Sequence, residues 1–171
     1  MGNVATAQST LGALMHELMA VARSGDAARC HEPMAGTTRQ VEGLRSEGRF
    51  GDLSIVIDEP VAFGGTGLAP NPAEVALAAL GASIEVTLRC YAEYHGIPVD
   101  SISVDLAGAL DNRGFFGADP TIRPGFPRID VRINVETAAP AADVARLIAE
   151  VERCCPVLDL FRNATHIDIS G

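Results

Sequence analysis

Apolar residues follow a helical spacing most clearly over residues 71–95. Pro72 suits a first helical turn, where a missing N–H costs nothing, and Gly96 and Pro98 predict the end of the helix. From 75 to 84 the residues are apolar nearly all round, which is typical of a helix buried on most sides. The pattern therefore predicts one long central helix.

Two faces of this helix are predicted to differ. Glu85, Arg89 and Glu93 lie at i, i+4 and i+8 with pairing signs, so we expect them to form its solvated strip. Another face carries small residues and Ser83, which lets a second element approach closely. Gly81 costs about 1 kcal/mol relative to Ala inside a helix, so we expect close packing at that position.

The remaining pattern alternates between strands and helices. Residues 39–45 and 53–57, with a turn at 46–51, predict a hairpin, and a last strand is expected at 165–169. The strict alternation over 101–106 and 128–136 predicts an antiparallel sheet with one wet face. Helices are expected over the following ranges, with residues 1–8 loose: 9–24, 140–154 and 157–161.

Helices and strands thus group in pairs, and this order predicts the α+β class. A chain of 171 residues suits one domain with a substantial core. We place an N-terminal helical extension at 1–37 and the main domain at 38–171. The extension suggests a packing appendage or a dimer arm.

Composition narrows the functions. The net charge of −9 argues against a nucleic-acid partner, and no apolar run reaches the roughly 18 residues of a membrane span. We see no signal peptide at the start of the sequence. The four cysteines do not form a disulfide framework and suggest a reducing, cytoplasmic compartment. Neither the four histidines nor the Cys30–His31 pair shows metal-ligand spacing, so no metal is expected.

The join at 111–125 is long for a hairpin and carries Phe115 and Phe116. Loops of that length are often functional or mobile. The two rings therefore mark a candidate binding element, either a lid over an apolar cleft or a surface loop that its own Phe pair holds down.

Two side chains stand out chemically. Pro156 at a first helical position puts Cys155 at the N-cap, where a thiolate is stabilised and its pKa should fall; the alternative is a buried, inert cysteine. Cys154 reads as core. Around Ser83 the sequence lacks the second glycine of a GxSxG motif, and His95 lies twelve residues on, about 18 Å along the helix, so a serine nucleophile is disfavoured.

The run DEPVAFGGTGLAPNPAEVALAALGASIEVTLRCYAEYHGIPV at 58–99, together with CPV at 155–157, resembles the OsmC-like family, which includes the organic hydroperoxide resistance proteins. The resemblance covers about residues 40–170. It implies antiparallel sheets wrapped around two long central helices of an intertwined homodimer. It also implies a thiol peroxidase that reduces organic hydroperoxides with a thiol reductant and no cofactor.

The family's residues map onto this sequence with one break. The resolving cysteine maps to Cys155, and the attacking cysteine maps to Ser83, in AALGAS where the family has AALGAC. The peroxide-orienting arginine maps to Arg45, with Arg49 as second choice. The glutamate maps to Glu74, as in the OsmC-like branch, because position 73 is Ala. Cys90, on nearly the same face as Ser83, is interpreted as core.

Three hypotheses stay open. The first is an enzyme, a hydroperoxide reductase that works through Cys155 without the usual attacking cysteine. The second is a non-catalytic module that binds a small apolar ligand in the dimer cleft near Phe115 and Phe116. The third is a structural homodimer whose N-terminal helix recruits a partner. The residues alone favour the second, whereas the resemblance implies a stress response to hydroperoxides.

Overall fold

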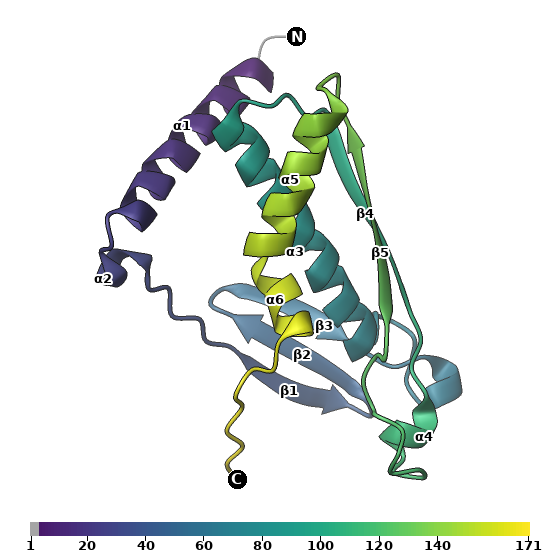
Figure 1. Cartoon of the computed structure of the whole chain (residues 1–171). Coiled ribbons are helices and arrows are strands. Elements are labelled where there is room, and N and C mark those ends of the chain that lie inside the picture. The colour runs from purple at the N-terminus through teal and green to yellow at the C-terminus, as the bar shows by residue number, and fades with distance from the viewer. Residues whose placement is uncertain (1–3) are drawn as a thin grey trace. The chain divides into compact units, whose positions relative to one another are not determined.

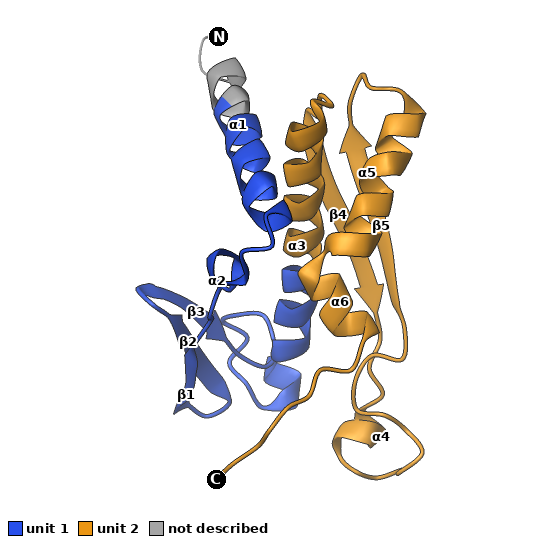
Figure 2. Cartoon of the chain, turned by 60° about the vertical axis from the view of Figure 1, so that its left-hand side comes forward, with its two compact units in different colours: residues 1–80 blue, residues 81–171 orange. Residues whose placement is uncertain are grey.

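A computed structural model describes residues 4–171, with side chains from Thr10 onward. The chain divides into two compact units, residues 1–80 and 81–171, which Figure 2 colours separately. The long helix predicted at 71–95 is present as α3 (Pro72–His95) and carries the boundary between the units.

Unit 1 contains two helices, a three-stranded antiparallel sheet in the order β1-β2-β3, and a short 3-10 turn (Figure 1). Thr38 pairs with Gly48, and Gly48 pairs in turn with Ile55, which fixes the register. The elements before α3 are α1 (Val4–Arg23), α2 (Ala27–Cys30), β1 (Thr37–Glu42), β2 (Arg45–Phe50), β3 (Leu53–Ile57) and η1 (Val61–Phe63).

The middle strand of this sheet corrects the sequence analysis. Residues 46–51 were expected to form a turn, but Arg45–Phe50 form β2. The chain reverses instead on either side of it, where Gly43 and Gly51 have φ values of 52° and 59°. Both lie in the left-handed region that glycine adopts without a side-chain clash. The expected hairpin is therefore a meander of three short strands.

The N-terminal helix was predicted correctly but is longer than expected. Residues 4–8, expected to be loose, belong to α1, and residues 1–3 lie outside the described residues. Gly25, with φ of 77°, follows its end. Leu14 and Leu18 on its apolar stripe are 45% and 50% exposed.

Unit 2 is built on the hairpin β4–β5, whose strands pair from Ser101↔Glu136 to Gly108↔Ile129. This antiparallel pair was predicted from the alternation. Within the unit, α5 and the second part of α3 lie on one side of the hairpin (Figures 1 and 2). The elements after α3 are β4 (Ser101–Gly108), α4 (Asn112–Phe115), β5 (Ile129–Glu136), α5 (Ala141–Cys154) and α6 (Pro156–Arg162).

The core of unit 2 forms where α3 and α5 pack over the sheet. Buried side chains from both helices and from the segment after α3 make it up, among them Ile84, Leu88, Ala92, Val99, Leu147 and Val151. Gly81 allows the close approach, because a Cβ at that position would lie 2.8 Å from Cδ1 of Leu106 on β4. Close packing is thus the reason for this mid-helix glycine, as predicted.

The solvent-facing side of α3 differs from the prediction. Arg89 and Glu93, expected on a solvated strip, have side chains only 27% and 12% exposed. Arg89 is held because its guanidinium donates to the carbonyl of Val99 at 2.6 Å. Beyond the first turn of α3, the exposed positions are instead small or apolar: Ala78, Ala79, Ala82 and Val86, of which Val86 is 63% exposed.

Within the described part of the chain, α3 is the one helix whose length and composition would suit a membrane span, with a mean hydropathy of 1.4 over its best window. This is weak evidence, because core helices pass the same test. Ile84, Leu88 and Ala92 are at most 1% exposed within the fold, which accounts for the apolar character of this part of α3.

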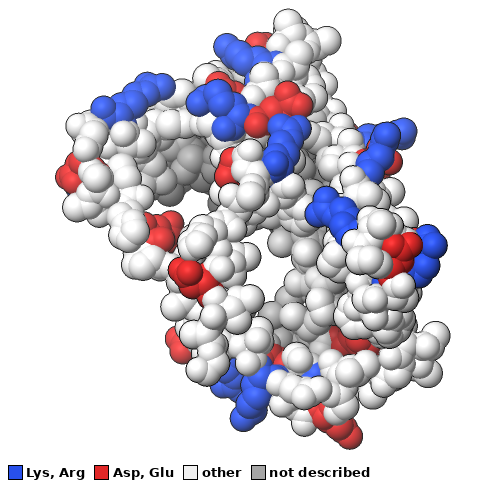
Figure 3. Space-filling view, turned by 60° about the horizontal axis from the view of Figure 1, so that its bottom comes forward, with Lys and Arg blue, Asp and Glu red and all other residues white. Residues whose placement is uncertain are grey.

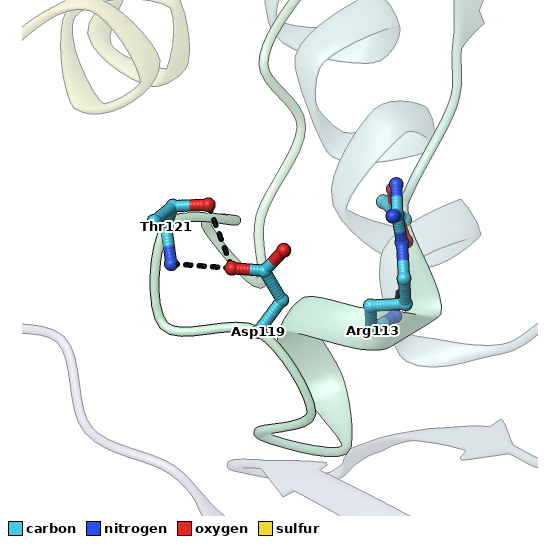
Figure 4. Close-up of polar contacts among 4 residues, drawn as sticks. Arg113, Asp119 and Thr121 are labelled. Atoms are coloured by element: carbon cyan, nitrogen blue, oxygen red, sulfur yellow. Dashed lines mark hydrogen bonds and ion pairs between the residues drawn. The ribbon is translucent and has the colours of Figure 1, made fainter.

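The β4–β5 connection is ordered by short polar contacts. Asp111 caps α4 and pairs with Arg113, and Asp119 accepts hydrogen bonds from the N–H and hydroxyl of Thr121 at 2.9 and 2.6 Å (Figure 4). A Cβ at Gly114 would lie 2.6 Å from the carbonyl oxygen of Arg123, so the loop closes on itself there. The connection is a compact surface loop.

The C-terminal strand expected at 165–169 is wrong. Residues after α6 have no strand pairing, and Ile167 and Ile169 are 74% and 93% exposed. Alternation alone does not make a strand, since a strand needs a sheet edge on which to pair its backbone groups. The apolar side chains of this C-terminal segment are therefore exposed to solvent.

All 13 basic residues of the protein are arginines. On the face drawn in Figure 3 they lie interspersed with acidic side chains, and no broad patch of one sign is visible. Charges of the two signs are thus mixed on this face of a chain whose net charge is −9.

Candidate functional site

The structure brings Ser83 and Cys155 together within unit 2. The Ser83 Oγ lies 3.2 Å from the Cys155 Sγ, although 72 residues separate them in the sequence. Either atom can donate the hydrogen bond. Cys155 is 2% exposed and Ser83 is half-buried. The pair is thus a sheltered hydroxyl–thiol contact between α3 and the α5–α6 junction.

The backbone fixes Cys155 at a helix junction. Its N–H donates to the carbonyl of Val151 at the end of α5, and its carbonyl accepts from the N–H of Asp159 in α6, both at 3.0 Å. It is therefore the last cap of one helix and the N-cap of the next, with Pro156 in the first turn, as the sequence predicted. Its side chain makes no capping bond to α6 and points to Ser83 instead.

An apolar cavity of about 300 Å³ lies in the same unit. Its wall comes from β5 and from α3, α5 and α6, the three helices that also position the Ser83–Cys155 pair. Aliphatic side chains form most of it: Ile84, Val131, Ile133, Ile148, Val151 and Leu158. Glu152 and Arg162 complete the lining. This volume is at the lower end of small-molecule sites.

Arg45 belongs to unit 1 and has a local partner. It lies on β2, and its guanidinium pairs with Glu42 at 2.9 Å, with 26% of the Arg45 side chain exposed. Arg49, the second choice, pairs with Glu47 at 3.1 Å. An arginine that orients a peroxide needs N–H groups that are free to donate. Arg45 and Arg49 each use part of their guanidinium to pair with a glutamate.

Glu74, also in unit 1, is engaged in helix capping. Its carboxylate accepts from the Asn71 N–H at 2.8 Å, and Asn71 Oδ1 accepts from the Glu74 N–H at 2.9 Å. This reciprocal pair is a capping box that satisfies two backbone donors of the first turn. The sequence carried this signal in the spacing Asn71-x-x-Glu74.

Phe115 and Phe116 form an edge-to-face pair with centroids 5.1 Å apart. They are 64% and 67% exposed, so the pair does not bury its own rings to hold the loop down. Neither belongs to the lining of the 300 Å³ cavity. Their role as binding residues stays a prediction.

The other cysteines differ from Cys155 in their surroundings. None of the four forms a disulfide, and Cys30 is exposed. Burial first, and then the charge of Glu93, raises the pKa of the half-buried Cys90 thiol. Cys90 is therefore disfavoured as a thiolate nucleophile.

Sequence reasoning missed that Tyr91 and Cys154 are neighbours. Burial, followed by a hydrogen bond with Cys154, raises the pKa of Tyr91 to about 12. Cys154 is half-buried, so its interpretation as core was only partly right. The sequence offered no signal, because 63 positions separate the two residues and the contact depends on how α3 and α5 pack.

No group of three or more His, Cys, Asp or Glu side chains that could hold a metal ion occurs among the residues that the structure describes. The Ser83 Oγ–Cys155 Sγ contact at 3.2 Å joins a buried thiol to a half-buried hydroxyl on a distant segment. It is the candidate site.

Comparison with protein families gives a match to the OsmC-like protein model over residues 65–170. That range covers more than half of the chain and includes both Ser83 and Cys155. The protein therefore belongs to the OsmC-like family. No curated protein matches its sequence.

Solved structures share this fold at low sequence identity. An OsmC-like protein from Mycoplasma pneumoniae matches with a TM-score of 0.67 at 15% identity, covering 77% of this chain and 88% of that one. An organic hydroperoxide resistance protein from Legionella pneumophila matches at 0.56 and 21%, covering 77% and 90%. One from Bacillus subtilis matches at 0.50 and 23%, covering 77% and 91%. The α+β OsmC fold predicted from the sequence is confirmed.

Proposed function

We propose that this OsmC-like protein serves in the response to organic hydroperoxides as a binder of a small apolar molecule, and that its native chain does not run a two-thiol reduction. The observation that carries the proposal is the contact of Ser83 Oγ with Cys155 Sγ at 3.2 Å. Structural relatives are named organic hydroperoxide resistance proteins, which supports the hydroperoxide part.

The chemistry of hydroperoxide reduction explains why oxygen in place of sulfur at position 83 matters. In a two-thiol cycle a thiolate attacks the O–O bond, becomes a sulfenic acid and releases an alcohol; a second thiol then forms a disulfide and releases water. Both electrons come from sulfur. A serine hydroxyl is not ionised at neutral pH and has no sulfenic state, so Ser83 cannot take the first step. Ser83 and Cys155 still face each other, but the position that would attack the peroxide carries a hydroxyl, which cannot be oxidised in this way.

A cycle on Cys155 alone is the competing route. Its sulfenic acid would have to be reduced by an external thiol, which must reach the sulfur. Cys155 is 2% exposed, so that approach is closed in this conformation. The binding function is therefore better supported than single-thiol catalysis.

The homodimer predicted from the sequence is part of the proposal. Within α3, Ala82 and Val86 lie at i and i+4 on an exposed face, and Val86 is 63% exposed. Small apolar residues in such a row allow close helix packing, and a second copy supplies the matching face. Val86→Arg is expected to convert a dimer to a monomer in light scattering at micromolar concentration. A monomeric wild-type protein would refute this part.

The deciding experiment follows consumption of cumene hydroperoxide with a dithiol reductant. The wild-type protein is expected to stay at background, and Ser83→Cys to gain turnover by roughly 100-fold or more, on the order of the contribution of an activated nucleophile. Ser83→Cys/Cys155→Ser should lose the gain. Ser103→Cys, which adds a thiol at an exposed position of β4, is the matched control.

Two outcomes would overturn the proposal. Wild-type turnover that Cys155→Ser abolishes would establish catalysis by Cys155 alone. Wild-type turnover that persists in Cys155→Ser would place the activity elsewhere. The binding part has its own readout: mass spectrometry of solvent extracts from freshly purified protein should find a co-purifying apolar molecule that is absent from a mock purification.

A further inference from the structure

The cavity of unit 2 is lined by residues of a single chain, unlike the dimer cleft considered above. Two of its side chains, Ile84 and Val151, are each 1% exposed, so its floor lies in the core. The wall is aliphatic, and such a surface favours an apolar body over a polar one by roughly 25 cal/mol for each Å² buried.

The mouth of this cavity carries one acid and one base. The side chains of Glu152 and Arg162 are 62% and 53% exposed, and Glu152 Oε1 lies 3.6 Å from Arg162 Nη2. That separation is longer than an ordinary hydrogen bond. The carboxylate therefore keeps acceptor positions, and the guanidinium keeps donors, for a third group between them.

We propose that this cavity binds a neutral molecule with an apolar body and a single hydroxyl group. A hydroxyl both donates and accepts, so its O–H can donate to Glu152 while its oxygen accepts from Arg162. An anion gains little, because Glu152 cancels the charge of Arg162 and the whole protein carries −9. A simple alkane leaves both charged groups without a new partner.

This site differs from the Ser83–Cys155 pair in chemistry and in the residues that form it. No bond is made or broken, and no sulfur is needed. The cavity would bind its ligand whether or not Ser83→Cys gains turnover, so the two proposals can fail separately.

The test is isothermal titration of the full-length protein with 1-octanol and, separately, with octanoate. Octanol is expected to bind about 10-fold more tightly than octanoate, equivalent to about 1.4 kcal/mol. Glu152→Gln, which removes the repelling charge, should narrow or reverse this preference. Arg146→Gln changes an arginine of α5 outside the lining and should leave it unchanged.

A filling substitution tests the location. Ile148→Trp puts a large ring into the cavity and should lower octanol affinity by at least about 10-fold, while Leu160→Trp, on the exposed side of α6, should not. Circular dichroism confirms that both variants fold. Equal binding of octanol and octanoate, or octanol binding that survives Ile148→Trp, would overturn the proposal. So would a change of oligomeric state in Ile148→Trp with octanol binding intact, which would make the cavity a seat for a second copy.

Discussion

Asp58 in unit 1 and Cys155 in unit 2 are both buried, and they differ in how many hydrogen bonds engage their side chains. In unit 1, Asp58 is 1% exposed and accepts hydrogen bonds from the N–H groups of Glu59, Thr66 and Leu68 and from the Thr66 hydroxyl. In unit 2, Cys155 is 2% exposed, and among the described residues its thiol forms a hydrogen bond with the Ser83 hydroxyl alone.

This contrast indicates that Asp58 serves to stabilise the fold, whereas the Ser83–Cys155 pair is available for chemistry or binding. Every side of the Asp58 carboxylate is engaged by the loop at 59–68, so no ligand can reach it without breaking the loop. The Ser83–Cys155 pair is held by backbone at both ends and has few side-chain partners, so its atoms can change without loss of the fold. The following predictions test that difference.

The largest effect is expected for Asp58→Ala. The variant leaves three backbone N–H groups without their acceptor in a buried loop, which is costly. We expect its melting temperature in calorimetry to fall by more than about 5 °C. Asp52→Ala, at an exposed turn of the same sheet, is the control and should change it by less than about 1 °C. Equal effects would contradict the assignment.

Acid should act on the same centre. The hydrogen bond from the Thr66 hydroxyl, with those from backbone N–H groups, lowers the pKa of Asp58 from 3.8 to about 2, against the effect of burial. A lowered pKa means that the folded state binds the proton less tightly than the unfolded state. The stabilisation is therefore complete above about pH 4 and is lost as pH falls toward 2. Urea titrations at pH 5, 4 and 3 should show a decline in the free energy of unfolding that is smaller in Asp58→Asn, where the lowered pKa values of Asp111 and Asp119 still contribute.

Glu74 is expected to give a moderate effect, because its role is to cap α3. Glu74→Ala should lower the free energy of unfolding by about 0.5–1 kcal/mol, and Glu74→Gln, which keeps the capping box, by less. Chemical denaturation measures both. An unchanged stability together with a loss of turnover in the Ser83→Cys background would show instead that the carboxylate serves the reaction.

The smallest effect on stability is expected for Ser83→Ala. It removes one half-buried hydroxyl whose described side-chain partner is a weakly hydrogen-bonding thiol, so the free energy of unfolding should change by less than about 1 kcal/mol. The same denaturation experiment provides the number. A loss as large as that of Asp58→Ala would mean that the pair is a structural centre after all.

The sequence predicted what depends on strong local patterns. The apolar surface of α3, the alternation in β4 and β5, and Pro156 after Cys155 each dictate one outcome. It failed for β2, because Arg45–Phe50 has no apolar alternation and its strand state depends on neighbours on both sides. It failed at 165–169 for the opposite reason, since the alternation is present but no partner strand is.

The site shows the same division. Ser83 was singled out by the family motif, and Cys155 by its place before Pro156 as well as by the motif, and the structure has the two side chains in contact. Arg45 and Glu74 were predicted as site residues only from where they align with the family pattern. Their hydrogen bonds with Glu42 and Asn71 depend on local backbone geometry, which the alignment does not contain. The cavity could not be predicted, because its wall joins four elements that are distant in sequence.

The junction between α5 and α6 has a further consequence for how such a protein can evolve. Main-chain hydrogen bonds at both ends of the junction fix the backbone of Cys155, and the hydroxyl that faces it stands on the long helix α3, whose backbone hydrogen bonds do not depend on the atom at that side-chain position. Cysteine and serine codons differ by a single nucleotide. A lineage with this architecture can therefore lose its oxidisable sulfur, or regain it, by one mutation that selection for stability does not oppose.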